Sequence, residues 1–254
     1  MLKFERVNSF FFVVVLLVYT FEVPKFLYFF IFLVWLVITI IGSFHIRWNY
    51  HLKALHSNPH TNKKQVAITF DDGPNLEFTP QILTFLKKHN IKATFFCVGK
   101  QIENHPKLFN QIVNQGHVVG NHSYSHSNNF GFFSHKKVLD DVNKCNELIY
   151  ENLNVNSNLF RPPFGVTNPA IRKAIAKTRH HVIGWNVRSL DTKIKNPEKI
   201  LKRITKRLKP GDVILLHDTN KRTLVVLEQL LLFLHEHQFE TTTVDKLFEI
   251  EAYV

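Results

Sequence analysis

Residues 65–74 read Gln-Val-Ala-Ile-Thr-Phe-Asp-Asp-Gly-Pro, an apolar run that ends in two adjacent acids and a turn. The run predicts a buried strand over residues 65–70, and the Gly-Pro pair predicts a sharp change of chain direction directly after the acids. Further strands are expected at 93–98, 117–121, 180–185 and 212–217. Helical patterns separate them at 78–89, 103–115, 135–152, 168–178, 198–208 and 223–237. This alternation predicts parallel strands joined by helices, and therefore an α/β sheet or barrel.

Polar side chains directly follow several of these expected strands. Asp71 and Asp72 come after the first strand, and His122 and His126 come after the third. His217 closes the last. Because the carboxyl ends of the strands in such folds surround one mouth, these residues are expected to meet there.

The two histidines are candidate metal ligands. On a helical turn, His122 and His126 would project from one face and could hold one cation. With an Asp across the mouth they predict a His₂Asp site with positions open for water, which suits zinc or another late divalent metal. Taken alone, an Asp-Asp-Gly-Pro turn is more often a solvated turn, and a histidine in a chain that has 15 is more often not a ligand.

The order of the motifs is more specific than any single motif. They are Thr69-Phe70-Asp71-Asp72-Gly73-Pro74, His122-Ser123-Tyr124-Ser125-His126, Arg161-Pro162-Pro163-Phe164 and Leu215-Leu216-His217. In this order and spacing they resemble the polysaccharide deacetylase family (carbohydrate esterase family 4, the NodB homology domain). The resemblance covers residues 65–247, and it implies a distorted (β/α) barrel with fewer than eight regular units.

The resemblance also implies a role for each residue of the first motifs. Asp72, His122 and His126 would bind a divalent metal, with zinc favoured and cobalt, nickel or manganese as alternatives. Asp71 would be the general base that deprotonates the attacking water, and Arg161 would pair with it and orient it. Amide hydrolysis needs an activated water, a stabilised oxyanion and a proton for the leaving nitrogen, so this division of labour is chemically consistent.

The later motifs would supply the acid and the substrate contacts. By the same resemblance, His217 would protonate the leaving amine, and Asp191 would hold its imidazole. The backbone N–H near Phe164, together with the metal, would stabilise the oxyanion. Pro163, Phe164 and Leu215 are expected to line the substrate site, with Leu215 as an apolar wall for the acetyl group.

The fourth motif departs from the family pattern. The family tends to show Asp-Ser-x-Asp-Trp, whereas residues 188–192 read Arg-Ser-Leu-Asp-Thr. Asp191 is kept, Thr192 replaces the aromatic wall of the acetyl pocket, and Arg188 places a cation where an acid is expected. We expect the chemistry to survive, and the fit of the acyl group and the substrate preference to change.

The first fifty residues differ sharply from the rest. Residues 26–44 form an uncharged apolar run of 19 residues, long enough to cross the ~30 Å hydrocarbon layer as a helix. A shorter run covers 10–21, and Pro24 separates the two. The pair predicts a transmembrane helical hairpin, or one span preceded by an interfacial helix. A cleaved signal peptide fits less well, because the run is long and no small-x-small site follows it.

Composition places a basic domain after this segment. Residues 51 onward carry 28 basic and 18 acidic side chains, a net charge of +10. Such a balance suits an anionic partner or simply a solvated surface, and no nucleic-acid motif is present, so no nucleic-acid partner is expected. Two lone cysteines give neither a disulfide framework nor a cysteine metal site. We expect a membrane anchor at 1–50, a linker at 51–64 and one catalytic domain at 65–254.

The resulting hypothesis is a metal-dependent hydrolase that removes N-acetyl groups from an amino-sugar polymer, either peptidoglycan or a chitin-like glycan. Its expected partners are the N-acetylated glycan and, through the N-terminal helices, membrane lipid. Charges flanking the apolar runs favour a cytoplasmic domain, but such polymers lie outside the membrane, so we expect the external face. The alternatives are a deacetylase of a lipid-linked or cytoplasmic-face acetamido sugar and an inactive carbohydrate-binding relative.

Overall fold

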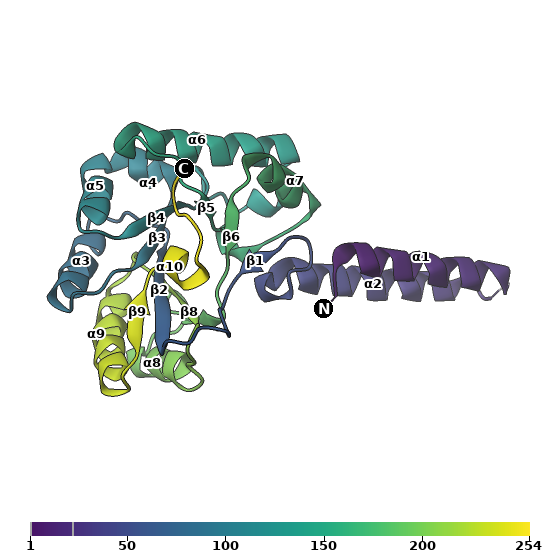
Figure 1. Ribbon diagram of the computed structural model, residues 1–254. Helices are drawn as coiled ribbons and strands as arrows, with labels where there is room; N and C mark the ends of the chain where they lie inside the picture. The colour runs from purple at the N-terminus through teal and green to yellow at the C-terminus, as the bar shows by residue number, and fades with distance from the viewer. Residues whose placement is uncertain (1, 22) are drawn as a thin grey trace.

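The computed structural model describes residues 2–21 and 23–254. Its centre is a sheet with strand order β1-β6-β5-β4-β3-β2-β8-β7, and β9 pairs with the start of β2. All the strand pairs are parallel. Within the described residues β7 does not pair with β1, so the sheet forms a half-barrel. Helices surround it, and an N-terminal helical hairpin projects to one side (Figure 1).

The strands are short and alternate with helices along the chain. The strands are β1 (Ala54–Leu55), β2 (Gln65–Asp71), β3 (Thr94–Cys97), β4 (Val118–Asn121), β5 (Leu159–Phe160), β6 (His181–Ile183), β7 (Val187–Arg188), β8 (Val213–His217) and β9 (Glu240–Thr242). The helices of the domain are α3 (Thr79–Lys88), α4 (Gly99–Asn104), α5 (Pro106–Asn114), α6 (His135–Leu153), α7 (Pro169–Thr178), α8 (Pro197–Thr205), α9 (Lys221–Glu236) and α10 (Val244–Phe248). The predicted distorted barrel with fewer than eight regular units is confirmed.

Strand β2 alternates between two packing layers. Ile68 and Phe70 belong to the core that packs against α3 and α9, whereas Ala67 belongs to a second core on the other face, which includes Leu215 of β8. Because side chains along a strand alternate with a period of two, Asp71 falls on the same face of the sheet as Ala67 and Thr69. Thr69 pairs with Leu215 of β8 in the sheet register. The register of β2 therefore places one acid inside the half-barrel, at the carboxyl end of the strand.

Two local details differ from the sequence pattern. The single helix expected over 103–115 is divided, because α4 ends at Asn104 and α5 begins at Pro106. Pro106 disfavours a helical conformation of the residue before it. His105 accordingly has φ −135° and ψ 54°, outside the helical region. Strands β1, β5, β7 and β9 have two or three residues each and give no periodic signal. β1 lies within 51–64, the stretch expected to be a linker, and it pairs with β6.

The N-terminal segment forms two helices that lie side by side, α1 (Phe4–Thr20) and α2 (Phe26–Phe44) (Figure 1). Nε1 of Trp35 on α2 donates to Oδ1 of Asn8 on α1 at 2.9 Å. α2 coincides with the predicted apolar run, and it is the one helix among the described residues that is long and apolar enough to cross a membrane. The segment is thus a hairpin that contains one candidate span.

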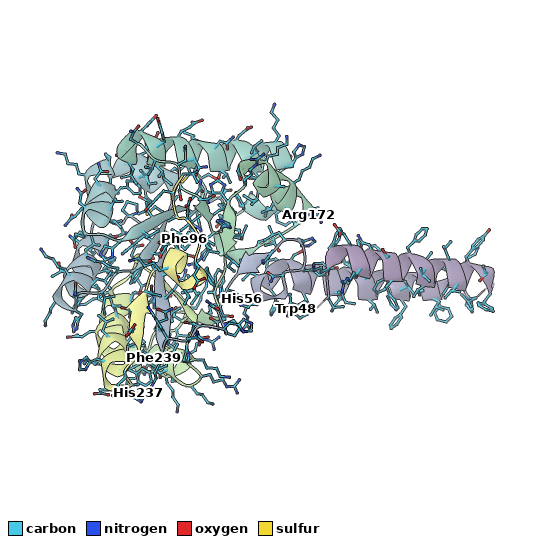
Figure 2. All side chains as sticks on the ribbon, in the orientation of Figure 1. Trp48, His56, Phe96, Arg172, His237 and Phe239 are labelled. Atoms are coloured by element: carbon cyan, nitrogen blue, oxygen red, sulfur yellow. The ribbon has the colours of Figure 1, made fainter. Side chains whose placement is uncertain are left out.

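Both ends of the hairpin meet the domain. Nη1 of Arg172 on α7 donates to Oε1 of Glu5 on α1 at 2.6 Å, and the N–H of Thr167 donates to the carbonyl of Ser43 on α2 at 2.9 Å. After α2 the chain continues through the 3-10 turn η1 (Ile46–Trp48), whose Ile46 is buried in the domain. In contrast, most side chains along the hairpin point into the surroundings (Figure 2).

Candidate active site

Five segments at one edge of the sheet hold the motif residues. These segments lie at the carboxyl ends of β2, β4, β5, β7 and β8, and Asp71 and His217 are themselves the last residues of β2 and β8. Because these strands are parallel, their carboxyl ends lie on the same edge, where folds of this kind build their sites. The predicted convergence of the polar residues is present in the structure.

Asp72, His122 and His126 direct one ligand atom each toward a common point. Oδ1 of Asp72 lies 3.4 Å from Nε2 of His122 and 3.2 Å from Nε2 of His126. All three ligand atoms lie within 4.8 Å of one another. Metal–ligand bonds of about 2.0–2.2 Å in a tetrahedral site would separate neighbouring ligand atoms by roughly 3–3.5 Å. One carboxylate and two imidazoles at these separations therefore fit a single divalent ion.

The backbone that presents this triad is a loop, so the expectation of a helical turn was wrong. Residues 122–126 lie outside helices and strands. Asp72, Ser123 and His126 have positive φ angles of 78°, 63° and 44°. The N–H of His126 donates to Oγ of Ser123 at 3.1 Å, which stabilises the turn. Residues other than glycine adopt this conformation at a cost of about 1–3 kcal/mol, which commonly marks functional sites.

Hydrogen bonding fixes the tautomer of His122. Its Nδ1 lies 2.7 Å from the carbonyl oxygen of Arg161. A carbonyl can only accept, so Nδ1 carries the proton and Nε2 presents its lone pair toward Asp72. Ligating histidines usually donate their second ring N–H in this way. The imidazole is therefore oriented as a ligand.

The protonation states of the triad also suit a metal. Burial raises the pKa of Asp72, but the interactions with His122 and the charges that His122, His217 and His126 carry when protonated outweigh burial and hold that pKa well below the usual range. Burial, with the nearby His122, lowers the pKa of His126 to about 4. At neutral pH Asp72 is thus a carboxylate and His126 a neutral imidazole, the forms in which these groups bind metals.

Asp71 forms a buried ion pair with Arg161. Nη1 of Arg161 donates to Oδ1 of Asp71 at 2.6 Å and to Oγ1 of Thr69 at 2.8 Å. The guanidinium also donates to the carbonyls of Ile183 and Gly184, and it is fully buried. The second oxygen, Oδ2, lies 3.7 Å from Nε2 of His122 and receives no hydrogen bond from Arg161. Arg161 thus leaves one carboxylate oxygen beside the metal triad.

His217 and Asp191 form a second ion pair. Nδ1 of His217 lies 2.8 Å from Oδ1 of Asp191, whose Oδ2 accepts from the backbone N–H of His217. Asp191 is fully buried and accepts further hydrogen bonds from Ser189 and Thr223. Burial lowers the pKa of His217, but the hydrogen bond and charge of Asp191, with the charges of Asp71 and Asp72, raise it to about 9. The imidazole is therefore protonated at neutral pH.

The expected substrate residues differ in exposure. Phe164 has φ 60°, is 45% exposed and has its ring centroid 4.8 Å from that of His126. Pro163 and Leu215 are buried. Phe164 can meet a ligand that arrives from solvent, whereas the other two can only form walls. Their substrate contacts remain predictions.

The two charged residues of the altered fourth motif point to different parts of the molecule. Asp191 faces His217, whereas Arg188 is exposed and lies with its guanidinium 5.8 Å from the ring centroid of Trp185. Arg188 lines a groove with residues of α8, which is described below. Thr192 is exposed and forms no buried aromatic wall.

The sequence did not indicate which groups Thr223 and Asp218 contact. Thr223 at the start of α9 donates to Oδ2 of Asp191 at 2.7 Å. Buried Asp218 accepts from Thr79 and lies against Gly73, where a Cβ atom would collide with its carboxylate. Each is an ordinary polar residue at a strand end or helix start, and only the packed structure shows what it supports.

A parallel half-barrel that carries a His₂Asp triad beside two ion pairs has the arrangement that metal-assisted hydrolysis requires. Comparison with known proteins narrows this class. The family model for polysaccharide deacetylase matches residues 58–183. The chain is 38% identical over 158 residues to a peptidoglycan-N-acetylglucosamine deacetylase of Bacillus cereus, and the match covers 62% of this chain and 57% of that relative.

Solved structures indicate the same family. A crystal structure of a peptidoglycan N-acetylglucosamine deacetylase matches with a TM-score of 0.73 and 32% identity, over 78% of this chain and 93% of that one. The chain belongs to the polysaccharide deacetylase family. A family 4 pseudoenzyme from Bacillus anthracis is also similar, with a TM-score of 0.69 and 31% identity over 74% of this chain and 66% of that one. Whether a member is active therefore depends on its own site residues.

Proposed function

We propose that this chain is a metal-dependent N-deacetylase that removes acetyl groups from N-acetylglucosamine or N-acetylmuramic acid units of peptidoglycan or a chitin-like glycan. The observation that carries the proposal is that the Asp72–His122–His126 triad lies beside the Asp71–Arg161 and Asp191–His217 ion pairs at one edge of the sheet. The relatives' names supply the substrate class, since the Bacillus cereus relative is a peptidoglycan deacetylase. The chain spans 57% of that relative, so the activity is proposed for this part alone.

The triad favours zinc as its metal. Two neutral imidazoles and one carboxylate are common zinc ligands, with cobalt, nickel or manganese as alternatives. A divalent ion held there would act as a Lewis acid toward the attacking water and the acyl oxygen. The remaining chemistry is assigned to side chains of the chain itself.

Asp71 is proposed as the general base. Arg161 donates a hydrogen bond to Oδ1 of Asp71, which leaves Oδ2 of Asp71 to accept the proton of the attacking water. The fixed guanidinium also prevents the carboxylate from rotating toward the core. A base in this position needs no movement before it accepts the proton.

His217 is proposed as the general acid. Asp191 engages Nδ1, so Nε2 is the ring nitrogen that can donate to the departing amine. The backbone N–H of Phe164 is proposed to donate to the developing oxyanion, beside Pro163 and Leu215 as walls of the acetyl pocket. Thr192 is exposed and stands where the family tends to have an aromatic residue, so we expect the preference for the acyl group to differ from that of relatives with the aromatic residue.

We further propose that residues 1–50 anchor the domain 65–254 in a membrane. Large apolar side chains on α2 are highly exposed, including Phe26 at 73% and Phe29 at 69%. Such a surface needs an apolar partner, and lipid matches its length and composition. The domain and the N-terminus lie at the same end of the hairpin, which puts Lys3, Arg6 and Arg47 on the side of the domain.

These flanking charges favour a cytoplasmic domain, whereas peptidoglycan lies outside. We place the domain on the external face because of the substrate class. Reporter fusions after Val254 decide the matter. Activity of a cytoplasm-restricted reporter alone would overturn this placement and favour the alternative, a deacetylase of a lipid-linked or cytoplasmic-face acetamido sugar.

Acetate release by the full chain in detergent tests the substrate. Chitin oligomers, peptidoglycan and a lipid-linked N-acetylated sugar are compared at equal concentrations of acetyl groups. The proposal expects release from at least one of the two polymers. Release from the lipid-linked sugar alone would support the alternative substrate, and release from none in the presence of added zinc would support an inactive carbohydrate-binding relative.

A further inference from the structure

A basic groove of about 850 Å³ lies between the end of α2 and the outer face of α8. One wall is formed by Phe44, His45, Ile46 and Arg47. The other is formed by α8 and the residues that follow it. The groove therefore begins where the apolar helix ends and the domain starts.

The second wall is densely charged. Residues 199–209 contain six exposed cations and no acid, namely Lys199, Lys202, Arg203, Lys206, Arg207 and Lys209. Ile200, which does not line the groove, is buried and fixes α8 against the core. The cations are thereby held on the side that faces the groove.

Two further cations come from distant parts of the chain. Arg47 donates from Nη1 to the carbonyl of Asn186 at 3.4 Å, and the carbonyl of Arg188 accepts from Nε of Arg203 at 2.8 Å. Arg188 is the residue that replaces an acid in the fourth motif. This departure from the family pattern thus adds positive charge to the groove.

The charge of the groove is not neutralised by the chain. Its one acid, Asp212, is buried and accepts from the side chain of Asn186 and the N–H of Lys209. Among the described ranges 2–21 and 23–254, no carboxylate lies within 4.0 Å of a cationic group of the groove. Eight cations around one cavity therefore lack an anion.

The position of the groove relative to the membrane indicates which class of anion it binds. A 19-residue helix is about 28 Å long, close to the ~30 Å hydrocarbon layer, so Phe44 marks the boundary with the headgroups. Trp48, labelled at the base of the hairpin in Figure 2, lies just beyond this boundary, where membrane proteins concentrate tryptophan. The groove opens at the same level, since Phe44 and Arg47 line it.

We propose that this groove binds the phosphate groups of anionic phospholipids in the leaflet next to the domain. The proposal rests on insertion of α2, and it goes beyond the deacetylase activity. Lipid is favoured over an anionic wall polymer because the groove is continuous with the end of the candidate span. Bound headgroups would fix the rotation of the domain about the hairpin and hold the domain close to the membrane.

The test uses the full chain in a neutral detergent and native mass spectrometry of retained lipid. Phosphatidylglycerol and phosphatidylcholine with the same acyl chains are compared for the wild type, for Lys202→Gln/Arg203→Gln/Arg207→Gln, and for a control, Lys87→Gln/Lys88→Gln/Lys107→Gln. The control removes three exposed charges from α3 and α5, which lie across the domain from the hairpin (Figure 1).

We expect the wild type and the control to retain phosphatidylglycerol at least tenfold better than phosphatidylcholine. Each Lys or Arg near an anionic surface contributes roughly a factor of five, so the groove variant should lose about a hundredfold in affinity for phosphatidylglycerol. Its acetate release from a soluble glycan should match the wild type, which separates this proposal from the catalytic one. If the triple variant does not fold, Arg207→Gln alone should show about a fivefold loss.

Three outcomes would overturn the proposal. The first is equal retention of the two lipids by the wild type, and the second is a phosphatidylglycerol preference that survives in the groove variant. The third is binding of inorganic phosphate or soluble poly(glycerol phosphate) as tight as that of phosphatidylglycerol at equal phosphorus concentration. That result would assign the groove to a free phosphate or to an anionic polymer.

Discussion

The buried carboxylate of Asp191 lies 2.8 Å from Nδ1 of His217 and accepts the backbone N–H of the same histidine. Burial lowers the pKa of His217, but the side-chain hydrogen bond and charge of Asp191, with the charges of Asp71 and Asp72, raise it to about 9, so the imidazole is protonated at neutral pH. A protonated imidazole can donate to a leaving amine, but it cannot act as a base. The relationship therefore assigns the direction of proton transfer at this side of the site.

The first prediction is a pH profile. Because the folded pKa of His217 lies above its ordinary value, the acid form is present at neutral pH and is lost as pH rises through about 9. We expect kcat/KM to fall over that range. Asp191→Asn removes the charge that raises this pKa, so the alkaline limb should move down by roughly one unit or more. An alkaline limb that does not move in Asp191→Asn would contradict the assignment.

The second prediction concerns the base. Asp71→Asn keeps the shape of the side chain and its contact with Arg161 but removes the proton acceptor. Turnover should fall by about 10²–10⁴-fold, the usual contribution of general acid–base catalysis. Metal content, measured by elemental analysis, should match the wild type. Near wild-type turnover in this variant would mean that another group takes the proton.

The third prediction concerns the metal. The full chain should bind about one zinc ion, since one set of three ligand atoms lies within 4.8 Å in the described residues. His126→Ala should lose most of this affinity and most of the increase in melting temperature that added zinc produces. His89→Ala, which alters an exposed histidine at the end of α3, serves as the control. Equal zinc binding by His126→Ala and the control would exclude the proposed triad.

The fourth prediction concerns the anchor. Apolar insertion is insensitive to salt, whereas adhesion of a basic surface to an anionic membrane is screened. The intact chain should therefore stay in the membrane fraction after a wash with 1 M salt (about 3 Å Debye length) and should leave it only with detergent. Recovery of the intact chain in the salt wash would show that α2 is not inserted.

Sequence reasoning was most successful where chemistry was concentrated in short motifs. Asp72, His122 and His126 meet as predicted, because the alternation of strands and helices makes the strands parallel, and the carboxyl ends of parallel strands share one edge of the sheet. The reason first given for the histidine pair was wrong, since a loop with positive φ angles brings the rings together and local spacing does not encode such angles.

Contacts that depend on packing between distant elements could not be predicted from the sequence pattern. Thr223 supports Asp191 from another helix, and nothing in its local sequence indicates this contact. The two-residue strands are held by their neighbours and have no periodicity of their own. The surroundings of Arg188 also required the structure, because Arg203 of α8 donates to its carbonyl and residues of η1 line the same groove.

The measurement that tests the central claim most directly is acetate release from N-acetylated glycan by the full chain, before and after removal of metal with a chelator. The account predicts release by the wild type, loss of release after chelation and recovery when about one equivalent of zinc is restored. Asp71→Asn should stay inactive at every step although it binds the same zinc. Full release by the chelated wild type, or recovery of Asp71→Asn with zinc, would contradict the account.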